Sequence, residues 1–333
     1  MNRIPTPAHL TAAIDTVAAL DLSVIVPVFN EAENIGPLHD QIAAELASLG
    51  KPFEIIWVDD GSTDRTREEL RRIAAGDPQT KVIELWRNYG QTAAMMAGID
   101  HARGRILMGL DGDGQNDPAD FKRLLQKLDE GFDVVSGWRQ KREDRWLTRR
   151  VPSQLANWLI SRVSGVKLHD YGCSLKAYRR EILDGVKLYG EMHRFIPIYA
   201  AWQGAKIVEL PVQHHPRRAG KSKYGLGRAF KVILDLLVVQ FLNKYLTKPI
   251  YVFGGFGLLA ISLALVAGFS GLWLKLAQGV ALIQTPLPLV AVMSAMIGLV
   301  SILMGLLAEI VVRVYFEAQT KDVYRVRARW NFD

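Results

Sequence analysis

Two long stretches without a charged residue stand in the C-terminal part of this 333-residue chain. The first covers residues 250–274 and the second residues 276–308, with only Lys275 between them. A helix needs about 20 consecutive apolar residues to cross the hydrocarbon core of a bilayer, and both stretches exceed that length. A buried helical hairpin in a soluble protein is the alternative. We predict two membrane-spanning helices.

The charges that flank these two stretches predict their orientation. Basic residues gather on both outer flanks, whereas the connecting segment holds only Lys275. The flanking residues are Lys244 and Lys248 before the first stretch, and Arg313, Lys321, Arg325, Arg327 and Arg329 after the second. Because Lys and Arg favour the cytoplasmic side of a membrane, we expect both termini and the domain before the spans in the cytoplasm.

The chain before these stretches alternates between apolar runs typical of buried strands and segments typical of helices. The expected strands cover residues 22–28, 53–58, 81–86, 105–110, 132–136 and 206–211, and the expected helices residues 35–49, 64–75, 91–101 and 119–128. Ser62 or Thr63 is expected to cap the second helix. The alternation predicts an α/β fold whose mostly parallel sheet has helices on both faces.

Polar motifs occupy the predicted carboxyl ends of four strands. They cover residues 27–31, 59–60, 88–90 and 111–115. Ligands bind open α/β sheets at the carboxyl ends of the strands, where these motifs would meet. The convergence predicts a nucleotide site at this edge of the sheet.

The motif Asp111-Gly112-Asp113-Gly114-Gln115 follows the fourth predicted strand. Two carboxylates two positions apart can face one hard cation, and the glutamine can add a neutral oxygen. Oxygen ligands of this kind suit Mg²⁺ or Mn²⁺, which also keep waters and bind substrate phosphates. Asp-Gly sequences are ordinary turn formers, so a solvated acidic turn is the alternative.

The formal net charge of +7 favours a partner that carries negative charge, such as nucleic acid, anionic lipid or a phosphorylated substrate. The basic residues cluster beside the predicted spans, which favours membrane lipids and phosphorylated substrates and argues against nucleic acid. The single cysteine, Cys173, excludes an intramolecular disulfide and fits a reducing compartment.

Five motifs together resemble a known family. Residues 26–31 (VPVFNE), 58–62 (VDDGS) and 111–115 (DGDGQ) resemble the family 2 glycosyltransferases of the GT-A fold. Residues 87–91 (RNYGQ) and 190–197 (GEMHRFIP) are similar to the polyprenyl-phosphate glycosyltransferases within that family. The resemblance implies a Rossmann-like GT-A domain that uses a nucleotide sugar.

The resemblance covers about residues 20–245, and two terminal spans are typical of the bacterial members. It therefore implies an integral protein of the bacterial inner membrane. The expected parts are an N-terminal lead-in (1–20), the GT-A domain (21–224), juxtamembrane interfacial helices (225–248), two transmembrane helices (249–312) and a cytoplasmic basic tail (313–333).

The resemblance also assigns roles to residues on the donor side. The residues expected to bind the nucleotide sugar are Pro27, Phe29, Glu31, Asp59, Asp60, Gly90, Gln91 and Asp111. Asp113 and Gln115 are expected to contact the metal directly, while Asp111 touches the ribose or a metal-bound water. Two alternatives stay open: Phe29 as a core aromatic, and Asp60 as a cap of the following helix at Thr63.

On the acceptor side, Arg139 matches the family's arginine near the reacting phosphates, and Asp170 an acidic residue near the acceptor. Asp170 is expected to act as a base, to orient the acceptor or to hold a basic neighbour. Asp170, Arg139 and Asp113 form the expected catalytic set. A basic loop suits a lid over two phosphate groups. Its residues are Arg217, Arg218, Lys221, Ser222 and Lys223, the serine by family position.

The resemblance implies inverting transfer of a sugar from a UDP- or GDP-sugar to a polyprenyl phosphate, undecaprenyl phosphate in a bacterium. One alternative is a processive polysaccharide synthase, which the missing Gln-x-x-Arg-Trp motif and the two spans disfavour. The other is a membrane-anchored, non-catalytic nucleotide-sugar-binding protein, which the retained acidic residues disfavour. The sugar, the nucleobase and the polyprenol length stay open. The apolar spans and residues 315–333 are compatible with a homo-oligomer.

Overall fold

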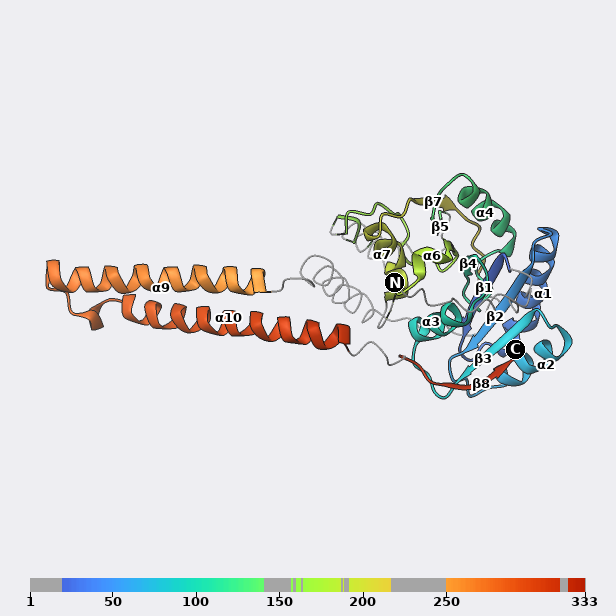
Figure 1. Ribbon diagram of the computed structural model, residues 1–333, viewed down its shortest axis with the longest axis horizontal. Helices are drawn as coiled ribbons and strands as arrows, with labels where there is room; N and C mark the ends of the chain where they lie inside the picture. The colour runs from blue at the N-terminus through green and yellow to red at the C-terminus, as the bar shows by residue number, and fades with distance from the viewer. Residues whose placement is uncertain are drawn as a thin grey trace, which may run out of the picture. The chain divides into compact units, whose positions relative to one another are not determined.

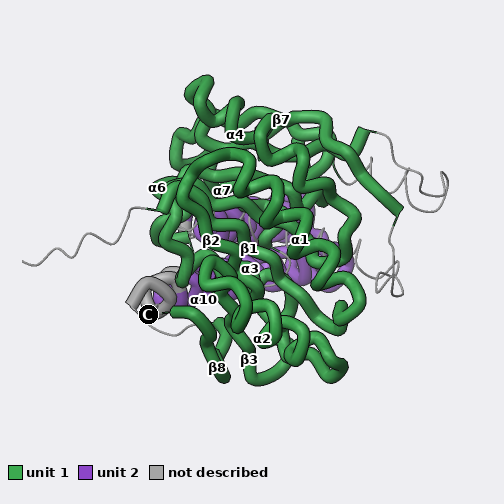
Figure 2. Tube along the Cα trace, turned by 90° about the vertical axis from the view of Figure 1, so that its right-hand side faces the viewer, with its two compact units in different colours: residues 1–235, 323–333 green, residues 236–322 purple. Residues whose placement is uncertain are grey.

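The computed structural model describes residues 20–140, 157, 160–162, 164–186, 188, 192–216, 250–317 and 323–332 (Figure 1). The chain forms two compact units (Figure 2). The first combines Met1–Asp235 with Val323–Asp333, and the second is Leu236–Asp322. The expected lead-in, the basic loop at 217–223 and the interfacial helices at 225–248 lie outside the described residues.

An eight-stranded sheet forms the centre of the first unit, in the order β7-β5-β6-β4-β1-β2-β3-β8. The strands are β1 (Leu22–Val28), β2 (Phe53–Asp59), β3 (Thr80–Leu85), β4 (Ile106–Gly109), β5 (Val134–Trp138), β6 (Lys176–Arg179), β7 (Ile207–Pro211) and β8 (Val326–Trp330). The neighbouring strands β4, β1, β2 and β3 pair in parallel, as do β5 and β7. β6 runs antiparallel to β4 and β5, and β8 antiparallel to β3. The predicted mostly parallel sheet is confirmed.

Helices cover both faces of this sheet, as predicted (Figure 1). They are α1 (Ala32–Ser48), α2 (Thr66–Gly76), α3 (Gln91–His101), α4 (Phe121–Asp129) after the 3-10 turn η1 (Pro118–Asp120), α6 (Arg180–Leu183) and α7 (Ile196–Trp202) after η3 (Met192–Phe195). α1, α2 and α4 share one hydrophobic core with β1 and β2. α3 packs against the other face of β1, β2 and β3.

Alternating side chains of β1 explain how both faces are filled. Val24 and Val26 point into the core that Ile35 and Ile42 of α1 complete. Ile25 points to the opposite face, where Gly98 lets α3 approach so closely that an added Cβ would overlap the isoleucine side chain. Strands buried on both faces read as continuous apolar runs, which is why β1 and β2 could be predicted.

Two strands and one helix cap differ from the prediction. β6 and β8 were not predicted, and β8 lies within residues 313–333, which were expected to form only a basic tail. Its pairing with β3 places the end of the chain in the sheet. The cap at Ser62 or Thr63 was wrong, because α2 begins at Thr66 without a side-chain cap.

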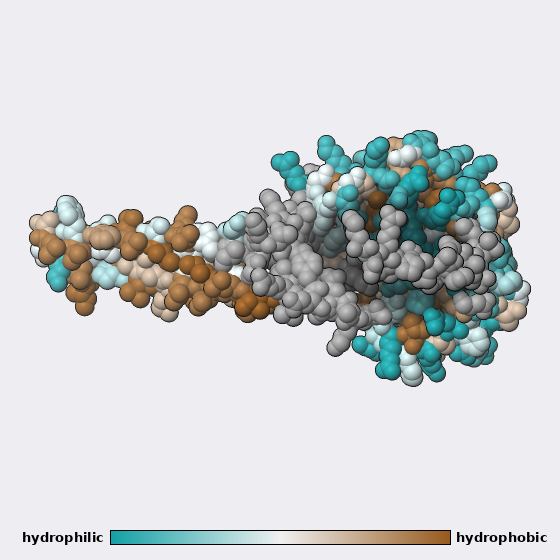
Figure 3. All heavy atoms as spheres, in the orientation of Figure 1, coloured by the Kyte–Doolittle hydropathy of each residue, from teal (hydrophilic) through white to brown (hydrophobic). Residues whose placement is uncertain are grey.

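The second unit contains two long helices, α9 (Ile250–Gln278) and α10 (Leu287–Glu317), joined through the 3-10 turn η4 (Leu282–Gln284). Both are long and apolar enough to cross a membrane. Hydrophobic side chains cover their visible face, and Leu276 is 77% exposed (Figure 3). A core hairpin of a soluble protein would bury these side chains, so the prediction of membrane helices accounts for the surface better.

Gly98 supplies a test of the packing between α3 and β1. We expect Gly98→Ala to lower the free energy of unfolding by about 1–3 kcal/mol, because the added methyl overpacks the contact with Ile25. Thermal unfolding of the full chain in detergent would measure the loss. Gly76→Ala at the end of α2 is the control, since no atom lies within 4 Å of the added Cβ. Equal effects of the two changes would contradict the packing.

Candidate active site

The acidic motif after β4 forms a loop that two glycines favour. A Cβ on Gly112 would overlap the side chain of Val28, so this glycine lets the loop lie against the end of β1. Gly114 has a φ of 69°, in the left-handed region that favours glycine. The loop leaves Asp111 half-buried and Asp113 8% exposed. The sequence therefore places two acidic side chains in a loop with little access to water.

The Asp111 carboxylate lies in an environment that disfavours its charged form. Burial and the neighbouring Asp113 carboxylate raise the pKa of Asp111. Gln91 Nε2 donates a hydrogen bond to Asp111 Oδ1 at 2.6 Å, and the backbone N–H of Gln115 donates to Asp113 Oδ1 at 3.2 Å. A divalent cation between the carboxylates would relieve their repulsion, so this oxygen donor set fits Mg²⁺ or Mn²⁺. Within the described residues, no group of three His, Cys, Asp or Glu side chains could hold an ion, so waters or substrate oxygens would complete its coordination.

The loop after β7 is attached to the acidic motif. The His215 N–H donates to the Gln115 carbonyl at 2.8 Å, and Gln115 Nε2 donates to the His215 carbonyl at 3.4 Å. His215 Nε2 lies 2.9 Å from Asp117 Oδ2, and His214 forms a β-bridge with Asn116. The chain therefore enters the predicted basic loop beside the acidic motif. The loop's own predicted residues, Arg217, Arg218, Lys221, Ser222 and Lys223, lie outside the described part of the chain.

Asp60 connects the ends of β2 and β3. Its carboxylate accepts hydrogen bonds from the N–H groups of Tyr89 at 2.7 Å and Gly90 at 2.9 Å. Burial raises the pKa of Asp60 to about 6, and these two donors oppose the rise. The alternative that Asp60 caps the following helix was wrong, because its acceptors are directed to the loop after β3. Gly90 directly precedes α3, and Gln91, the first residue of that helix, donates to Asp111.

Asp59 is fully buried and already has partners. It accepts a hydrogen bond from the Ser62 N–H at 3.0 Å and forms an ion pair with Arg67 Nε at 2.9 Å. The predicted contact of Asp59 with a nucleobase or ribose would share this carboxylate with Arg67, an α2 residue that the sequence analysis did not single out.

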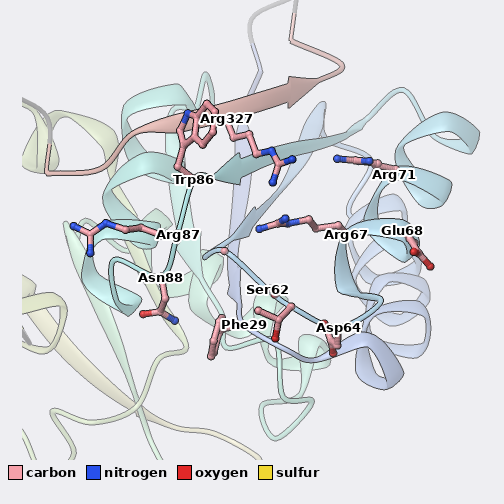
Figure 4. A pocket seen from close by; sticks show the side chains of 12 residues that line it. Phe29, Ser62, Asp64, Arg67, Glu68, Arg71, Trp86, Arg87, Asn88 and Arg327 are labelled. Atoms are coloured by element: carbon pink, nitrogen blue, oxygen red, sulfur yellow. The ribbon is translucent and has the colours of Figure 1, made fainter.

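A cavity of about 770 Å³ lies over the carboxyl ends of β1, β2 and β3 (Figure 4). It is lined by Phe29, Gly61, Ser62, Thr63, Asp64, Arg67, Glu68, Arg71, Trp86, Arg87, Asn88 and Arg327. Phe29 is half-buried at its wall, whereas Pro27 is buried within β1, and Glu31 accepts a hydrogen bond from Asn34 Nδ2 at 2.7 Å. The core-aromatic alternative for Phe29 does not describe this position.

Arg139 and Asp170 form a buried, bidentate ion pair. Arg139 Nε donates to Asp170 Oδ2 at 2.7 Å, and Nη2 donates to Oδ1 at 2.9 Å. Glu209 of β7 accepts a hydrogen bond from the Asp170 N–H at 2.9 Å and so fixes the loop. Of the three roles predicted for Asp170, holding a basic neighbour is the one seen in this geometry. Action as a base stays a prediction.

Comparison with known proteins identifies the family. Residues 23–186 match the model for glycosyl transferase family 2. The dodecaprenyl-phosphate galacturonate synthase of Rhizobium johnstonii is 44% identical over 321 residues, which are 94% of each chain. The chain belongs to glycosyl transferase family 2. This glycosyltransferase is also 38% identical to the undecaprenyl-phosphate 4-deoxy-4-formamido-L-arabinose transferase of Edwardsiella ictaluri, over 92% of this chain and 93% of that one.

Solved structures share the fold of this glycosyltransferase. Mannosyl-3-phosphoglycerate synthase from Rubrobacter xylanophilus aligns with a TM-score of 0.52 and 16% identity, over 67% of this chain and 74% of that one. Glucosyl-3-phosphoglycerate synthase from Mycobacterium tuberculosis, solved with Mn²⁺, UDP and phosphoglyceric acid, aligns with a TM-score of 0.51 and 19% identity, over 67% and 79%. The predicted GT-A fold is confirmed.

The Arg139–Asp170 pair generates a prediction that separates positioning from base catalysis. We expect Asp170→Asn to lower the free energy of unfolding by about 3–5 kcal/mol, because it leaves a buried guanidinium without its charged partner. Glu130→Gln, which breaks an exposed pair with Lys127, should change it by less than about 1 kcal/mol. Thermal unfolding in detergent measures both. A variant at Asp170 that keeps full stability but loses turnover would favour the base instead.

Proposed function

We propose that this glycosyltransferase transfers a sugar, with inversion, from a nucleoside diphosphate to a polyprenyl phosphate. The proposal rests on the hydrogen bond between His215, which lies just before the basic loop, and Gln115 of the acidic motif. This contact brings the start of the basic loop next to the acidic motif. Such an arrangement suits a reaction between two phosphorylated substrates, a donor diphosphate held through a cation and an acceptor phosphate held by basic side chains.

The donor would lie along the carboxyl ends of the strands. Asp111 and Asp113, with Gln115, would hold Mg²⁺ or Mn²⁺ against the diphosphate, and the cation would neutralise charge that develops on the departing UDP or GDP. The cavity beside Phe29 would take the nucleoside. The Mn²⁺ and UDP in the related glucosyl-3-phosphoglycerate synthase support this arrangement.

The acceptor would be undecaprenyl phosphate or a polyprenyl phosphate of similar length. The names of the two relatives above include a dodecaprenyl or undecaprenyl phosphate, and α9 and α10 suit a protein that meets a lipid substrate in the bacterial inner membrane. The basic loop at 217–223 would bind the phosphate from the cytoplasmic side, together with anionic lipid head groups.

One phosphate oxygen of the acceptor would attack the anomeric carbon from the face opposite the diphosphate. The carbon–oxygen bond to the diphosphate breaks, and its electron pair leaves with the nucleoside diphosphate. A phosphate monoester has a second pKa of about 6, so the nucleophile is already ionised at neutral pH. The acceleration would therefore come from alignment and charge neutralisation, with Arg139 held by Asp170 beside the reacting phosphates.

Asp113 provides the direct test. We expect Asp113→Asn to lower the rate of polyprenyl-phosphate sugar formation at least about 100-fold, because charge stabilisation by a bound metal contributes several kcal/mol. The assay would supply purified protein with undecaprenyl phosphate, Mn²⁺ and a panel of UDP- and GDP-sugars. Asp129→Asn, the same change at an exposed position of α4, should leave the rate unchanged.

The same assay separates the two alternatives. A polymeric product would indicate a processive synthase. Nucleotide-sugar binding without any product, in wild-type protein, would indicate a non-catalytic binding protein. Full activity of Asp113→Asn would overturn the assignment of the metal site.

A further inference from the structure

Three arginine side chains converge at one end of the cavity. Arg67 and Arg71 extend from α2 and Arg327 from β8, and their guanidinium groups point toward one another (Figure 4). Arg87 points away from them and lies over the Tyr89 ring, 4.5 Å from its centroid. This end of the cavity is therefore rich in hydrogen-bond donors, because a guanidinium donates and never accepts.

Two of the three arginines are occupied within the protein. Arg67 pairs with Asp59 at 2.9 Å. Arg71 donates twice to Glu84, from Nε at 2.6 Å and from Nη2 at 2.7 Å. Both carboxylates are fully buried. These pairs hold the two guanidinium groups in place, so only the N–H groups that the pairs leave unused could reach a ligand.

Arg327 differs from both. Among the described residues it has no carboxylate partner, and its guanidinium lies 5.7 Å from the centroid of the Trp86 ring. A cation over an aromatic ring is held without using its N–H donors in the plane. Arg327 therefore has donors to offer to a group that enters the cavity.

The backbone of β8 is irregular at this residue. Ala328 pairs with Glu84 and Val326 with Leu85, so Arg327 is an extra residue between two consecutive residues of β3. This is a β-bulge, a feature that redirects a side chain and occurs often at sheet edges and beside active sites. The bulge accounts for the direction of Arg327 into the cavity.

The sheet order indicates which part of the donor reaches this place. From β4, where the acidic motif stands, the order runs β4-β1-β2-β3-β8. Neighbouring strands lie about 4.8 Å apart, so β8 is about 19 Å from β4 across the sheet. A diphosphate bound at Asp111 and Asp113 is too far away to meet Arg327. The far end of the donor, its nucleobase, is the group that can.

We infer that Arg327 selects the nucleobase of the donor by donating a hydrogen bond to a ring carbonyl oxygen. Uracil and guanine present an acceptor, O4 or O6, where cytosine and adenine carry an amino donor. An arginine donor therefore favours the first two bases and leaves an unpaired donor against the others. The inference rests on the proposed function, and it makes a residue that follows the membrane helices part of donor recognition.

Titration of the full-length protein in detergent with UDP, GDP, CDP and ADP in the presence of Mn²⁺ tests the inference. Wild-type protein should bind UDP at least about tenfold more tightly than CDP, or GDP at least about tenfold more tightly than ADP. In each pair the second nucleotide carries an amino group where the first has a carbonyl. Arg327→Gln should reduce that ratio to about threefold or less, because a glutamine amide offers both a donor and an acceptor. Arg327→Lys, which keeps donors and charge, should retain most of the preference.

Arg329→Gln is the matched control, since it removes the same charge from an exposed residue of the same strand that does not line the cavity. It should keep the wild-type ratio. Wild-type preference in Arg327→Gln, or an equal loss of preference in Arg329→Gln, would overturn the inference while leaving the proposed function intact. Failure of wild-type protein to bind any of the four nucleotides would overturn both.

Discussion

The hydrogen bonds from the Tyr89 and Gly90 N–H groups to the buried Asp60 carboxylate are the constraint on which the site depends. They fix the loop after β3 against the end of β2, and this loop leads directly into α3. Gln91, the first residue of that helix, then donates to Asp111. Three strand ends are thereby linked into one surface, with the carboxylates of the acidic motif at one side and the cavity at the other.

The sequence predicted those parts of the fold that rest on burial. β1, β2 and α4 could be predicted, because parallel strands covered on both faces are continuously apolar and α4 has buried residues at helical spacing. β6 and β8 could not. β6 has four residues with charged residues at both ends, and β8 alternates arginines with apolar residues at an exposed edge. Their stabilisation comes from partner strands distant in the sequence, which no local pattern contains.

Some residues of the site could likewise be predicted from the sequence, and others could not. The acidic motif could be predicted because closely spaced carboxylates and glycines at a strand end have few structural uses other than a turn or a cation site. For Asp170, holding an unnamed basic neighbour was one of three predicted roles, and a sequence does not state that this neighbour is Arg139. Arg67 gave a weak local signal on the helix after β2, whereas Arg327 gave none, because β8 reaches the cavity only through its pairing with β3.

The pairing of β8 with β3 also affects the order of events during synthesis. β3 is translated early, while the strand that covers its edge is translated only after both long apolar helices. Until then the backbone N–H and C=O groups along that edge have no strand beside them, and an unpaired edge invites association with other chains. Synthesis of both long helices therefore precedes completion of the sheet, and the edge of β3 is open to association with other chains during that interval.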